Sequence, residues 1–423
     1  MFRYIDIRSY FNRVGFAFRA LRSPNFRKFF YGQIVSLMGT YIQNLALGWL
    51  IYRLTNSPFL LGVIGFAGQI PSLFLTPIAG VYADRVNRRM VLIGSQTLSM
   101  VMAFTLAILY LADVIQIWQI VLVAVVNGIA LAFDTPFRHA FLLEMVGDRD
   151  LLQNAIALNS TLINSARFIG PTIGGFIIAW LGEGWCFIIN GFSFMAVIAS
   201  LISMRIKPMN THHHHGSILQ ELAEGLIYSY RNKTIRYLLL LISAIGLIGM
   251  PFQVFMPVFA RDILHGDSQL LGFLTGSLGA GALMGAFYLA SRKSIGSLPK
   301  IILFSSIVFV IGLLVFALST YTALSLLMIF FTGFGMIVQF AATNTLLQHI
   351  VDEDKRGRVV ALYGLSFMGI TPLGSLLLGS ISPTIGVQLT LAIAGLLCLS
   401  AVVLFGRKYG TIAQTVKRFE NSH

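Results

Sequence analysis

Ionisable side chains are scarce in the apolar stretches of this chain, and Asp134 and Arg167 are the two whose positions suggest chemistry. Asp134 stands in Phe133-Asp134-Thr135-Pro136, close to the end of one stretch. Arg167 lies about eight residues inside another, or about 12 Å along a helix. A charge in apolar surroundings is costly and is therefore functional by default. We expect Asp134 to be able to carry a proton. Arg167 either pairs with Asp134, binds an acidic group such as a catecholate, carboxylate or phosphate, or extends to the polar end of its stretch.

A second group of charges lies in the segment Gly80-Val81-Tyr82-Ala83-Asp84-Arg85-Val86-Asn87-Arg88-Arg89. Gly80 permits close packing of two helices, and Asp84 can face the N-terminus of a neighbouring helix. Arg85, Arg88 and Arg89 gather positive charge in the way that cytoplasmic loops do. A loop that was merely positive would need neither the glycine nor the aspartate.

Amide side chains supply most of the other polar groups in the apolar stretches. Each amide alone is more often an interhelical hydrogen bond than a ligand contact. Together with Phe, Tyr and Met, they suit a cavity for a bulky amphipathic solute. The candidates for substrate contact or coupling, besides Arg167, are Gln33, Gln43, Asn44, Gln69, Asn127, Asn164, Gln253, Gln339 and Asn344.

Glycines and one proline follow Arg167 in the order Gly170-Pro171-Thr172-Ile173-Gly174-Gly175. Glycines let neighbouring helices approach each other, and Pro171 interrupts the backbone hydrogen bonds locally. This segment therefore predicts either a bend on which helices can rock or simple close packing.

Residues for catalysis or for a resident cofactor are not evident. There is no G-x-x-x-x-G-K-[ST] loop for ATP, no nucleophile constellation and no acid–base pair. Cys186 and Cys398 stand far apart and suggest neither a metal site nor a disulfide. The tract His212-His213-His214-His215 can bind Zn or Ni, but a solvated linker is the favoured interpretation. We expect a protein that is not an enzyme and has no cofactor and no metal.

The composition points to a membrane protein. Of the 423 residues, 56% are hydrophobic and 11% are charged, whereas soluble proteins have roughly 25% charged residues. Too few charges exist to cover soluble domains, which excludes a soluble enzyme, a disordered chain and a fibrous protein. The net charge of +14 is attributed to basic cytoplasmic loops and not to nucleic-acid binding.

Apolar runs of about 20 residues, the length that crosses a bilayer, predict an all-α protein with twelve transmembrane helices. Barrel strands would instead show short alternating segments. The expected spans are 27–52, 59–82, 90–111, 117–140, 159–180, 185–204, 235–258, 269–291, 299–318, 323–347, 359–380 and 384–406.

Lys and Arg predict the orientation. If the N-terminus is cytoplasmic, only Arg53 and Arg261 fall in outer loops and Arg167 falls within a span. This asymmetry favours both termini in the cytoplasm. Trp49, Trp118, Trp180 and Trp185 then lie near the outer ends of spans, as an interfacial aromatic belt requires.

Weak internal repeats divide the spans six and six. Arg53-Leu54-Thr55-Asn56-Ser57 before Leu60-Leu61-Gly62 is similar to Arg261-Asp262 before Leu270-Leu271-Gly272, and Gly170-Pro171-Thr172-Ile173-Gly174 to Thr371-Pro372-Leu373-Gly374. Repeats of this size indicate a transporter with its substrate between two bundles. The expected organisation is an amphipathic N-terminal segment 1–23, a six-helix bundle 24–204, a central cytoplasmic loop 205–234, a second bundle 235–406 and a cytoplasmic tail 407–423.

The twelve spans, the repeat and the G-x-x-x-D-R-x-x-R-R segment together resemble the major facilitator superfamily. Ser36-Leu37-Met38-Gly39-Thr40-Tyr41-Ile42-Gln43-Asn44 and Arg53-Leu54-Thr55-Asn56-Ser57-Pro58 resemble its bacterial secretion-type exporters, which include enterobactin exporters, macrolide efflux proteins and lysophospholipid flippases. The resemblance implies that Arg88 pairs with an acid on span four, for which Asp134 is the candidate, and that Asp84, Arg88 and Asp134 form a cytoplasmic latch. A static salt bridge is the alternative. Around Ala290-Ser291-Arg292-Lys293-Ser294 the second half lacks the aspartate of the motif.

The resulting expectation is a secondary active exporter of siderophore- or drug-like amphipathic molecules, working by alternating access in the bacterial inner membrane. It would be a monomer in the lipid bilayer, and Asp134 is the candidate proton carrier for coupled export. A lysophospholipid flippase of the same fold is one alternative. A membrane receptor or scaffold that transports nothing is another.

Overall fold

The computed structural model describes residues 18–83, 85–206, 218–292 and 294–422, and the described residues form helices without any strand. Twelve of the helical segments are long and apolar enough to cross a membrane, which confirms the predicted number. They are α2 (Pro24–Thr55), α3 (Pro58–Tyr82), α4 (Arg88–Leu111), α5 (Ile117–Val146), α6 (Arg149–Leu181), α7 (Glu183–Ile202), α9 (Lys233–Ala244) with its continuation to Ile263, α11 (Ser268–Ala290), α12 (Leu298–Leu318), α13 (Thr322–Ile350), α14 (Arg356–Gly364) with α15 (Thr371–Ile385), and α16 (Val387–Arg407).

Several helices extend beyond the apolar runs that predicted them. Helix α6 begins at Arg149, ten residues before the expected start at 159, and its N-cap Asp148 accepts a hydrogen bond from the backbone N–H of Asp150 at 2.9 Å. Helix α5 continues to Val146 and ends at Gly147, whose φ of 74° favours glycine. Hydropathy indicates the membrane-embedded part of a helix, while capping residues fix its ends.

The seventh and eleventh spans are irregular, although the sequence predicted continuous helices. After α9 the chain forms a π-helical turn η2 (Ile245–Gly249), a 3₁₀ segment η3 (Met250–Phe255), the short α10 (Met256–Val258) and a second π turn η4 (Phe259–Ile263). A π turn η6 (Leu365–Gly369) interrupts the eleventh span. Pro251 and Pro257 contribute, because proline cannot donate the backbone hydrogen bond that a regular helix requires.

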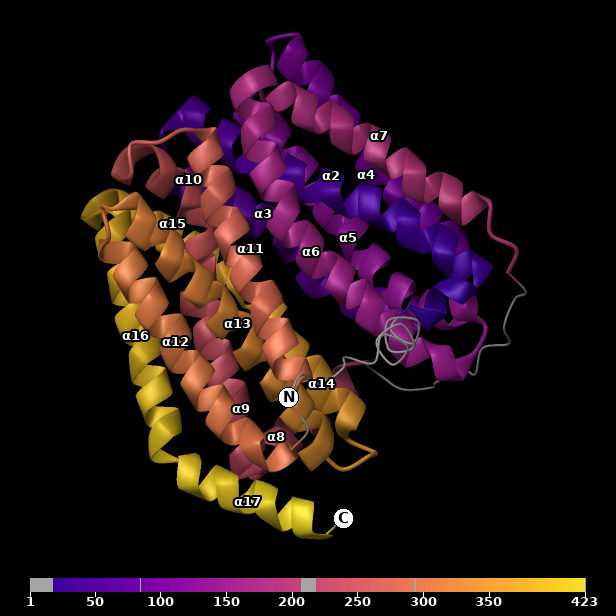
Figure 1. The fold of residues 1–423 in the computed structure, drawn as a ribbon, viewed down its shortest axis with the longest axis vertical. Helices are drawn as coiled ribbons and strands as arrows, with labels where there is room; N and C mark the ends of the chain where they lie inside the picture. The colour runs from indigo at the N-terminus through magenta and orange to yellow at the C-terminus, as the bar shows by residue number, and fades with distance from the viewer. Residues whose placement is uncertain (1–17, 84, 207–217, 293, 423) are drawn as a thin grey trace, which may run out of the picture.

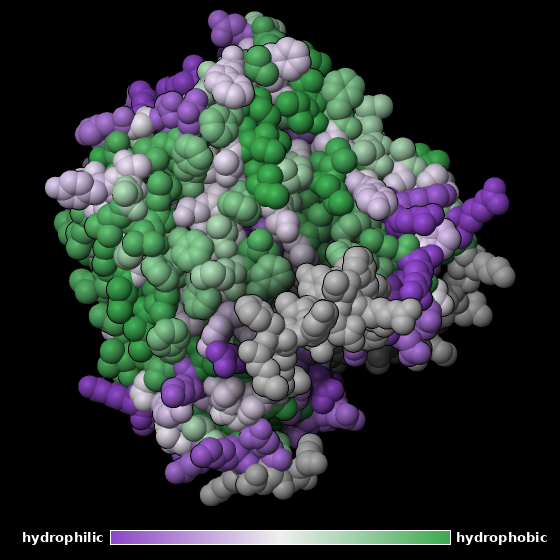
Figure 2. Space-filling model, viewed as in Figure 1, coloured by the Kyte–Doolittle hydropathy of each residue, from purple (hydrophilic) through white to green (hydrophobic). Residues whose placement is uncertain are grey.

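The helices form two groups that follow the order of the chain. Figure 1 shows α2 to α7, coloured indigo to magenta, beside the orange and yellow helices of the C-terminal part. We call residues 18–206 the first half and residues 218–422 the second half. The two halves contact each other mainly through α6 against α11 and α3 against α15. Figure 2 shows hydrophobic side chains covering the middle of the molecule, with hydrophilic ones at its two ends.

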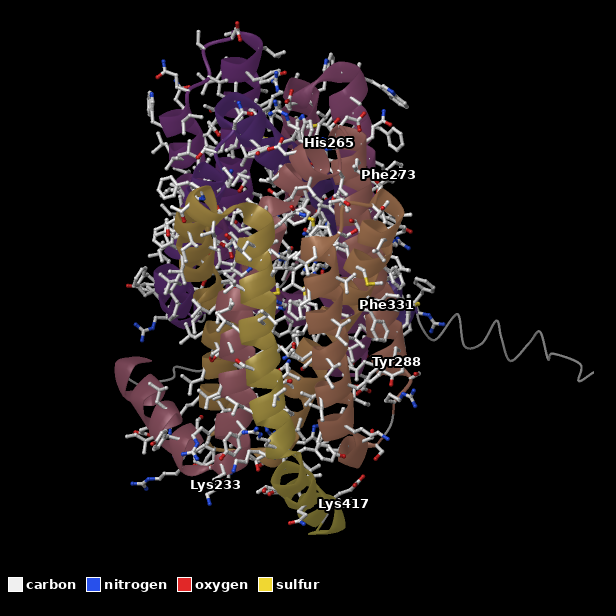
Figure 3. The ribbon with its side chains drawn as sticks, turned by 90° about the vertical axis from the view of Figure 1, so that its left-hand side faces the viewer. Lys233, His265, Phe273, Tyr288, Phe331 and Lys417 are labelled. Carbon is white, nitrogen blue, oxygen red and sulfur yellow. The ribbon has the colours of Figure 1, made fainter. Side chains whose placement is uncertain are left out.

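The two ends of the molecule are named here by residues that lie at them. The Asn56 end carries the C-terminus of α2 and the N-terminus of α11, and the Arg88 end carries the N-terminus of α4 and helix α17 (Tyr409–Ser422). Figure 3 shows Lys233 and Lys417 at the Arg88 end and His265 at the opposite one. Trp118, Trp180 and Trp185 lie at helix ends near Asn56 and are exposed.

Helix α8 (Ile218–Arg231) lies within the segment 205–234 that the sequence suggested to be a loop. Glu224 of α8 is paired with Arg358 of α14. The hydroxyl of Tyr228 donates a hydrogen bond to Asp352 at 2.9 Å, and burial raises the pKa of this hydroxyl. The predicted amphipathic segment is described only from residue 18 onward, where Arg19–Arg22 forms a 3₁₀ turn. The histidine tract at 212–215 lies outside the described residues.

Candidate functional site

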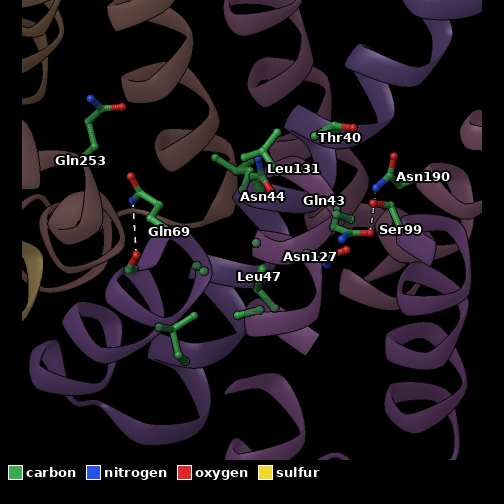
Figure 4. A pocket seen from close by; sticks show the side chains of 18 of the residues that line it. Thr40, Gln43, Asn44, Leu47, Gln69, Ser99, Asn127, Leu131, Asn190 and Gln253 are labelled. Atoms are coloured by element: carbon green, nitrogen blue, oxygen red, sulfur yellow. Dashed lines mark hydrogen bonds between the residues drawn. The ribbon is translucent and has the colours of Figure 1, made fainter. Parts of the chain in front are cut away.

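A cavity of about 540 Å³ lies between the two halves. Helices α2, α3, α4, α5 and α7 provide its wall in the first half, and η3, α10 and α11 provide its wall in the second. Figure 4 shows amide and hydroxyl side chains from several of these helices around it. The polar residues that line the cavity are Gln33, Ser36, Thr40, Gln43, Asn44, Gln69, Gln96, Ser99, Asn127, Asp134, Arg138, Asn190, Gln253 and Thr275.

The cavity is walled by both halves only toward the Asn56 end. From the second half it is lined by Gln253, Val254, Met256, Pro257, Leu271 and Thr275, all in the part of the molecule near that end. Toward the Arg88 end, the lining residues, such as Gln33, Gln96 and Arg138, belong to the first half alone. The two halves therefore diverge toward the Arg88 end, as Figure 1 also shows.

Glycines bring the two halves together at the Asn56 end. A Cβ atom on Gly62 of α3 would lie 2.5 Å from the carbonyl oxygen of Ser375, and one on Gly175 of α6 would lie 2.6 Å from that of Ser268. Distances under 3.0 Å leave no room for a side chain. The predicted close packing of Gly175 is therefore observed, and it takes place across the two halves.

Polar contacts close the same end. The hydroxyl of Tyr52 donates to the carboxylate of Asp262, and Nη1 of Arg261 donates to Oδ1 of Asn56 at 2.8 Å. These contacts join the two segments that the sequence identified as repeats of each other, before Leu60 and before Leu270. The sequence showed that the two segments are similar, but it did not indicate that they contact each other.

Asp134 is buried, and its partners differ from the predicted one. Oδ1 accepts a hydrogen bond from Nε2 of Gln96 at 2.6 Å, and Oδ2 is 2.7 Å from Nη2 of Arg138. The pair of Asp134 and Arg138, one turn apart on α5, is neutral overall. Among the described residues that line the cavity, these two are the only charged side chains.

The predicted pair of Arg88 with Asp134 is wrong. Nη1 of Arg88 lies 2.5 Å from Oε1 of Glu144, and its Nε donates to the carbonyl of Ala83 at 2.8 Å. Arg88 starts α4 at the very end of the molecule, whereas Asp134 lies ten residues before Glu144 on α5, or about 15 Å deeper. Glu144 is at the depth that Arg88 can reach.

The remaining residues of the predicted latch have separate environments. Asp84 lies outside the described residues. Arg85 is exposed, and Arg89 donates to the carbonyl of Ile202. A Cβ on Gly80 would meet no atom of the described residues within 4 Å, so Gly80 makes no close helix contact in the present state.

Arg167 does not pair with Asp134, so this part of the prediction is also wrong. Its Nε donates to the hydroxyl of Tyr41 at 3.4 Å, and it is not among the residues that line the cavity. The neighbouring glycines serve packing: a Cβ on Gly170 would lie 2.7 Å from Cβ of Tyr41, and one on Gly174 would lie 3.3 Å from Cα of Ile42. Pro171 lies within α6, which is not interrupted there.

Six of the predicted amide residues do line the cavity, namely Gln33, Gln43, Asn44, Gln69, Asn127 and Gln253. Three others do not. Asn164 donates to the carbonyl of Ser160 on its own helix, and Asn344 accepts from Gln348. Gln339 is buried within the second half.

Seven polar residues of the cavity were not predicted from the sequence, namely Ser36, Thr40, Gln96, Ser99, Arg138, Asn190 and Thr275. The spacing of four residues between Asp134 and Arg138 was a readable signal, because such pairs face each other on a helix. The expected aromatic surroundings are nearly absent, since Phe194 is the only aromatic residue among the described residues that line the cavity. The described residues hold no group of three or more metal-ligating side chains.

Comparisons with known proteins agree with this architecture. Residues 16–414 match the family model described as transmembrane secretion effector. The staphyloferrin A transporter of Staphylococcus aureus is 25% identical over 390 residues, which cover 89% of this chain and 95% of that protein. The multidrug efflux pump Tap of Mycolicibacterium fortuitum is 26% identical over 378 residues, covering 87% and 92%.

Solved structures show the same fold. The crystal structure of the nucleoside transporter NupG has a TM-score of 0.68 at 14% identity, covering 90% of this chain and 98% of that one. A bacterial homologue of the human lysosomal transporter Spinster has a TM-score of 0.66 at 16% identity, covering 94% and 98%.

Proposed function

This chain belongs to the transmembrane secretion effector family of major facilitator transporters, and from that premise we propose that it exports siderophore- or drug-like amphipathic molecules from the bacterial cytoplasm. The observation that carries the proposal is the cavity, which has polar walls from both halves, is closed at the Asn56 end and widens toward the Arg88 end. A solute entering from the Arg88 end would be released at the other end after the halves reorient.

The proposed mechanism is alternating access by two six-helix bundles, corresponding to the first and second halves, in a monomer spanning the inner membrane. The contacts of Gly62 and Gly175 and the Tyr52–Asp262 hydrogen bond close the outer side in the present state. The pair of Arg88 and Glu144 joins α4 and α5 within the first half and is formed while the Arg88 end is open, so this pair alone would not latch the two halves together.

Proton coupling is proposed for Asp134, whose carboxylate lines the cavity in contact with Arg138 and Gln96. Arg167 is proposed to contact anionic groups in a state in which α2 and α6 separate. The measurement for Arg167 is the transport of an anionic and a neutral solute by Arg167→Lys, and equal loss for both would contradict this role.

The proposed export is tested in a bacterial strain that lacks its own major efflux pumps. Cells producing the protein are loaded with radiolabelled erythromycin, ethidium or staphyloferrin A, and the retained solute is measured over time. We expect at least one of these solutes to be retained less than in cells with the empty vector, with the difference removed by an uncoupler. Equal retention of all three would contradict the proposed function.

The proposed orientation predicts which loops face the outside. After replacement of Cys186 and Cys398 by alanine, a single cysteine is introduced at Ala112, exposed at the Asn56 end, or at Glu353, exposed near the Arg88 end. An impermeant maleimide should label the Ala112→Cys variant in intact cells and the Glu353→Cys variant only after lysis. Labelling in the opposite order would reverse the assignment of the two ends.

A further inference from the structure

Two polar residues of α13 are buried without hydrogen-bonding partners. Gln339 and Thr343 each have 0% exposure. Neither amide atom of Gln339, nor the hydroxyl of Thr343, has a hydrogen-bonding partner among the described residues. A protein normally avoids such burial, because an unsatisfied buried polar group loses its interactions with water and gains none in return. Two residues one helical turn apart with this defect call for an explanation.

In the internal repeat, these residues are the counterparts of Asp134 and Arg138. A Cβ on Gly128 of α5 would lie 2.4 Å from the carbonyl oxygen of Gly68. In the second half, a Cβ on Gly333 of α13 would lie 2.0 Å from the carbonyl oxygen of Leu278. In the repeat that pairs Leu60-Leu61-Gly62 with Leu270-Leu271-Gly272, the position equivalent to Gly68 is Leu278. The same close contact therefore exists in both halves and matches Gly128 with Gly333.

This match extends along the two helices. With the same sequence offset that relates Gly128 to Gly333, the counterpart of Asp134 is Gln339 and the counterpart of Arg138 is Thr343. In the first half, Asp134 and Arg138 are charged, form an ion pair with each other and line the cavity. In the second half the pair is neutral, unsatisfied and outside the present cavity.

Irregular helix lies next to this neutral pair. The ring of Phe340 lies 4.0 Å from the ring of Phe367 in the π turn η6, and the hydroxyl of Tyr363 donates to the carbonyl of Phe340 at 3.0 Å. Turn η6 in turn contacts the π turn η2, where Thr371 donates to the carbonyl of Gly246 at 3.0 Å. π turns inside α-helices are frequent at functional sites.

We propose that Gln339 and Thr343 form the second half's substrate contact, which joins the cavity when the Asn56 end opens and the segments around η6 and η2 rearrange. Being uncharged, the pair would take hydroxyl, carbonyl or amide groups of the solute, while Asp134 and Arg138 face its charged groups. This inference rests on the proposed export function and names the part of the site that acts after reorientation.

The experiment compares Gln339→Leu and Thr343→Val with wild type for thermal stability in detergent and for efflux of the solute that wild type exports. Removing an unsatisfied polar group should raise the unfolding temperature by about 2–4 °C. Losing a hydrogen bond to the solute should reduce efflux by about tenfold. Higher stability together with weaker efflux is the result that a merely structural role would not produce.

Thr332→Val is the matched control, because Thr332 is equally buried on α13 but its hydroxyl donates to the carbonyl of Met328 at 2.8 Å. It should leave efflux unchanged. Unchanged efflux in both Gln339→Leu and Thr343→Val would overturn the inference, as would lower stability with lost efflux in both. If wild type exports none of the three solutes, the proposed function fails instead, so the two failures are distinguishable.

Discussion

Replacing Asp134 by alanine should abolish export and lower the free energy of unfolding by about 3–5 kcal/mol, the usual cost of removing one partner of a buried ion pair. Asp134 is 6% exposed, and both of its oxygens are engaged, one by Gln96 and one by Arg138. The substitution leaves the guanidinium of Arg138, whose side chain is 12% exposed, without its carboxylate. Stability is measured by thermal unfolding of the purified protein, and export by solute retention in cells.

A double variant separates the contribution of the charge pair to stability from that of Asp134 to transport. Asp134→Ala combined with Arg138→Ala should recover part of the lost stability, because no lone charge remains. Export should stay abolished if Asp134 carries the coupling proton. Recovery of export in the double variant would show that the pair is structural and would remove Asp134 from the coupling mechanism. Glu353→Ala, whose side chain is 92% exposed, is the control and should match wild type in both measurements.

The expected effect on export is larger at Asp134 than at Arg88 and Glu144, because Asp134 and Arg138 line the cavity whereas Arg88 and Glu144 do not. The effects on stability should be of similar size. The side chains of Arg88 and Glu144 are 11% and 12% exposed, and those of Arg138 and Asp134 are 12% and 8% exposed, so each substitution would leave one charge of a buried pair without its partner.

The sequence predicted the number and order of the spans because a bilayer imposes a minimum apolar length on each helix. It also located most of the amides that line the cavity, since polar residues in such spans tend to face the interior of the protein. It did not give the partner of Arg88, which depends on how far each helix extends beyond the apolar run. Asp134 and Glu144 lie on one helix, and only the true start of α4 decides between them.

The second half shows a different limit of sequence analysis. Its seventh span reads as one continuous apolar run, and yet it contains two π turns and a 3₁₀ segment. Pro251 and Pro257 signal an interruption but not its form, because the form also depends on packing against neighbouring helices, which a linear sequence does not record. The contact between the repeated segments at Tyr52 and Asp262 likewise depends on the conformational state, which a sequence does not record.

The second large effect is expected at the closed end, where Gly175→Val should displace the protein toward a state that is open at the Asn56 end. The new Cβ would lie within 2.6 Å of the carbonyl oxygen of Ser268 and 3.0 Å from Cα of Gly272. Both are backbone atoms of α11, which cannot turn aside as a flexible side chain can. Overpacking of this kind costs about 1–3 kcal/mol, which shifts a two-state equilibrium by roughly five- to more than a hundredfold.

Accessibility of a cysteine at Ile64 measures this shift, because Ile64 lines the cavity on α3 and is 7% exposed. In the background without native cysteines, an impermeant maleimide added to intact cells should label Ile64→Cys slowly in the otherwise unchanged protein and rapidly with Gly175→Val. Gly94→Val is the matched control, since a Cβ at Gly94 would meet nothing within 4 Å. Export should fall with Gly175→Val alone, because a transporter that cannot close its outer side returns to load solute less often. Equal protection of the cysteine in both valine variants would mean that the glycine contact does not hold the Asn56 end closed, and the Tyr52–Asp262 and Arg261–Asn56 hydrogen bonds would then have to do so.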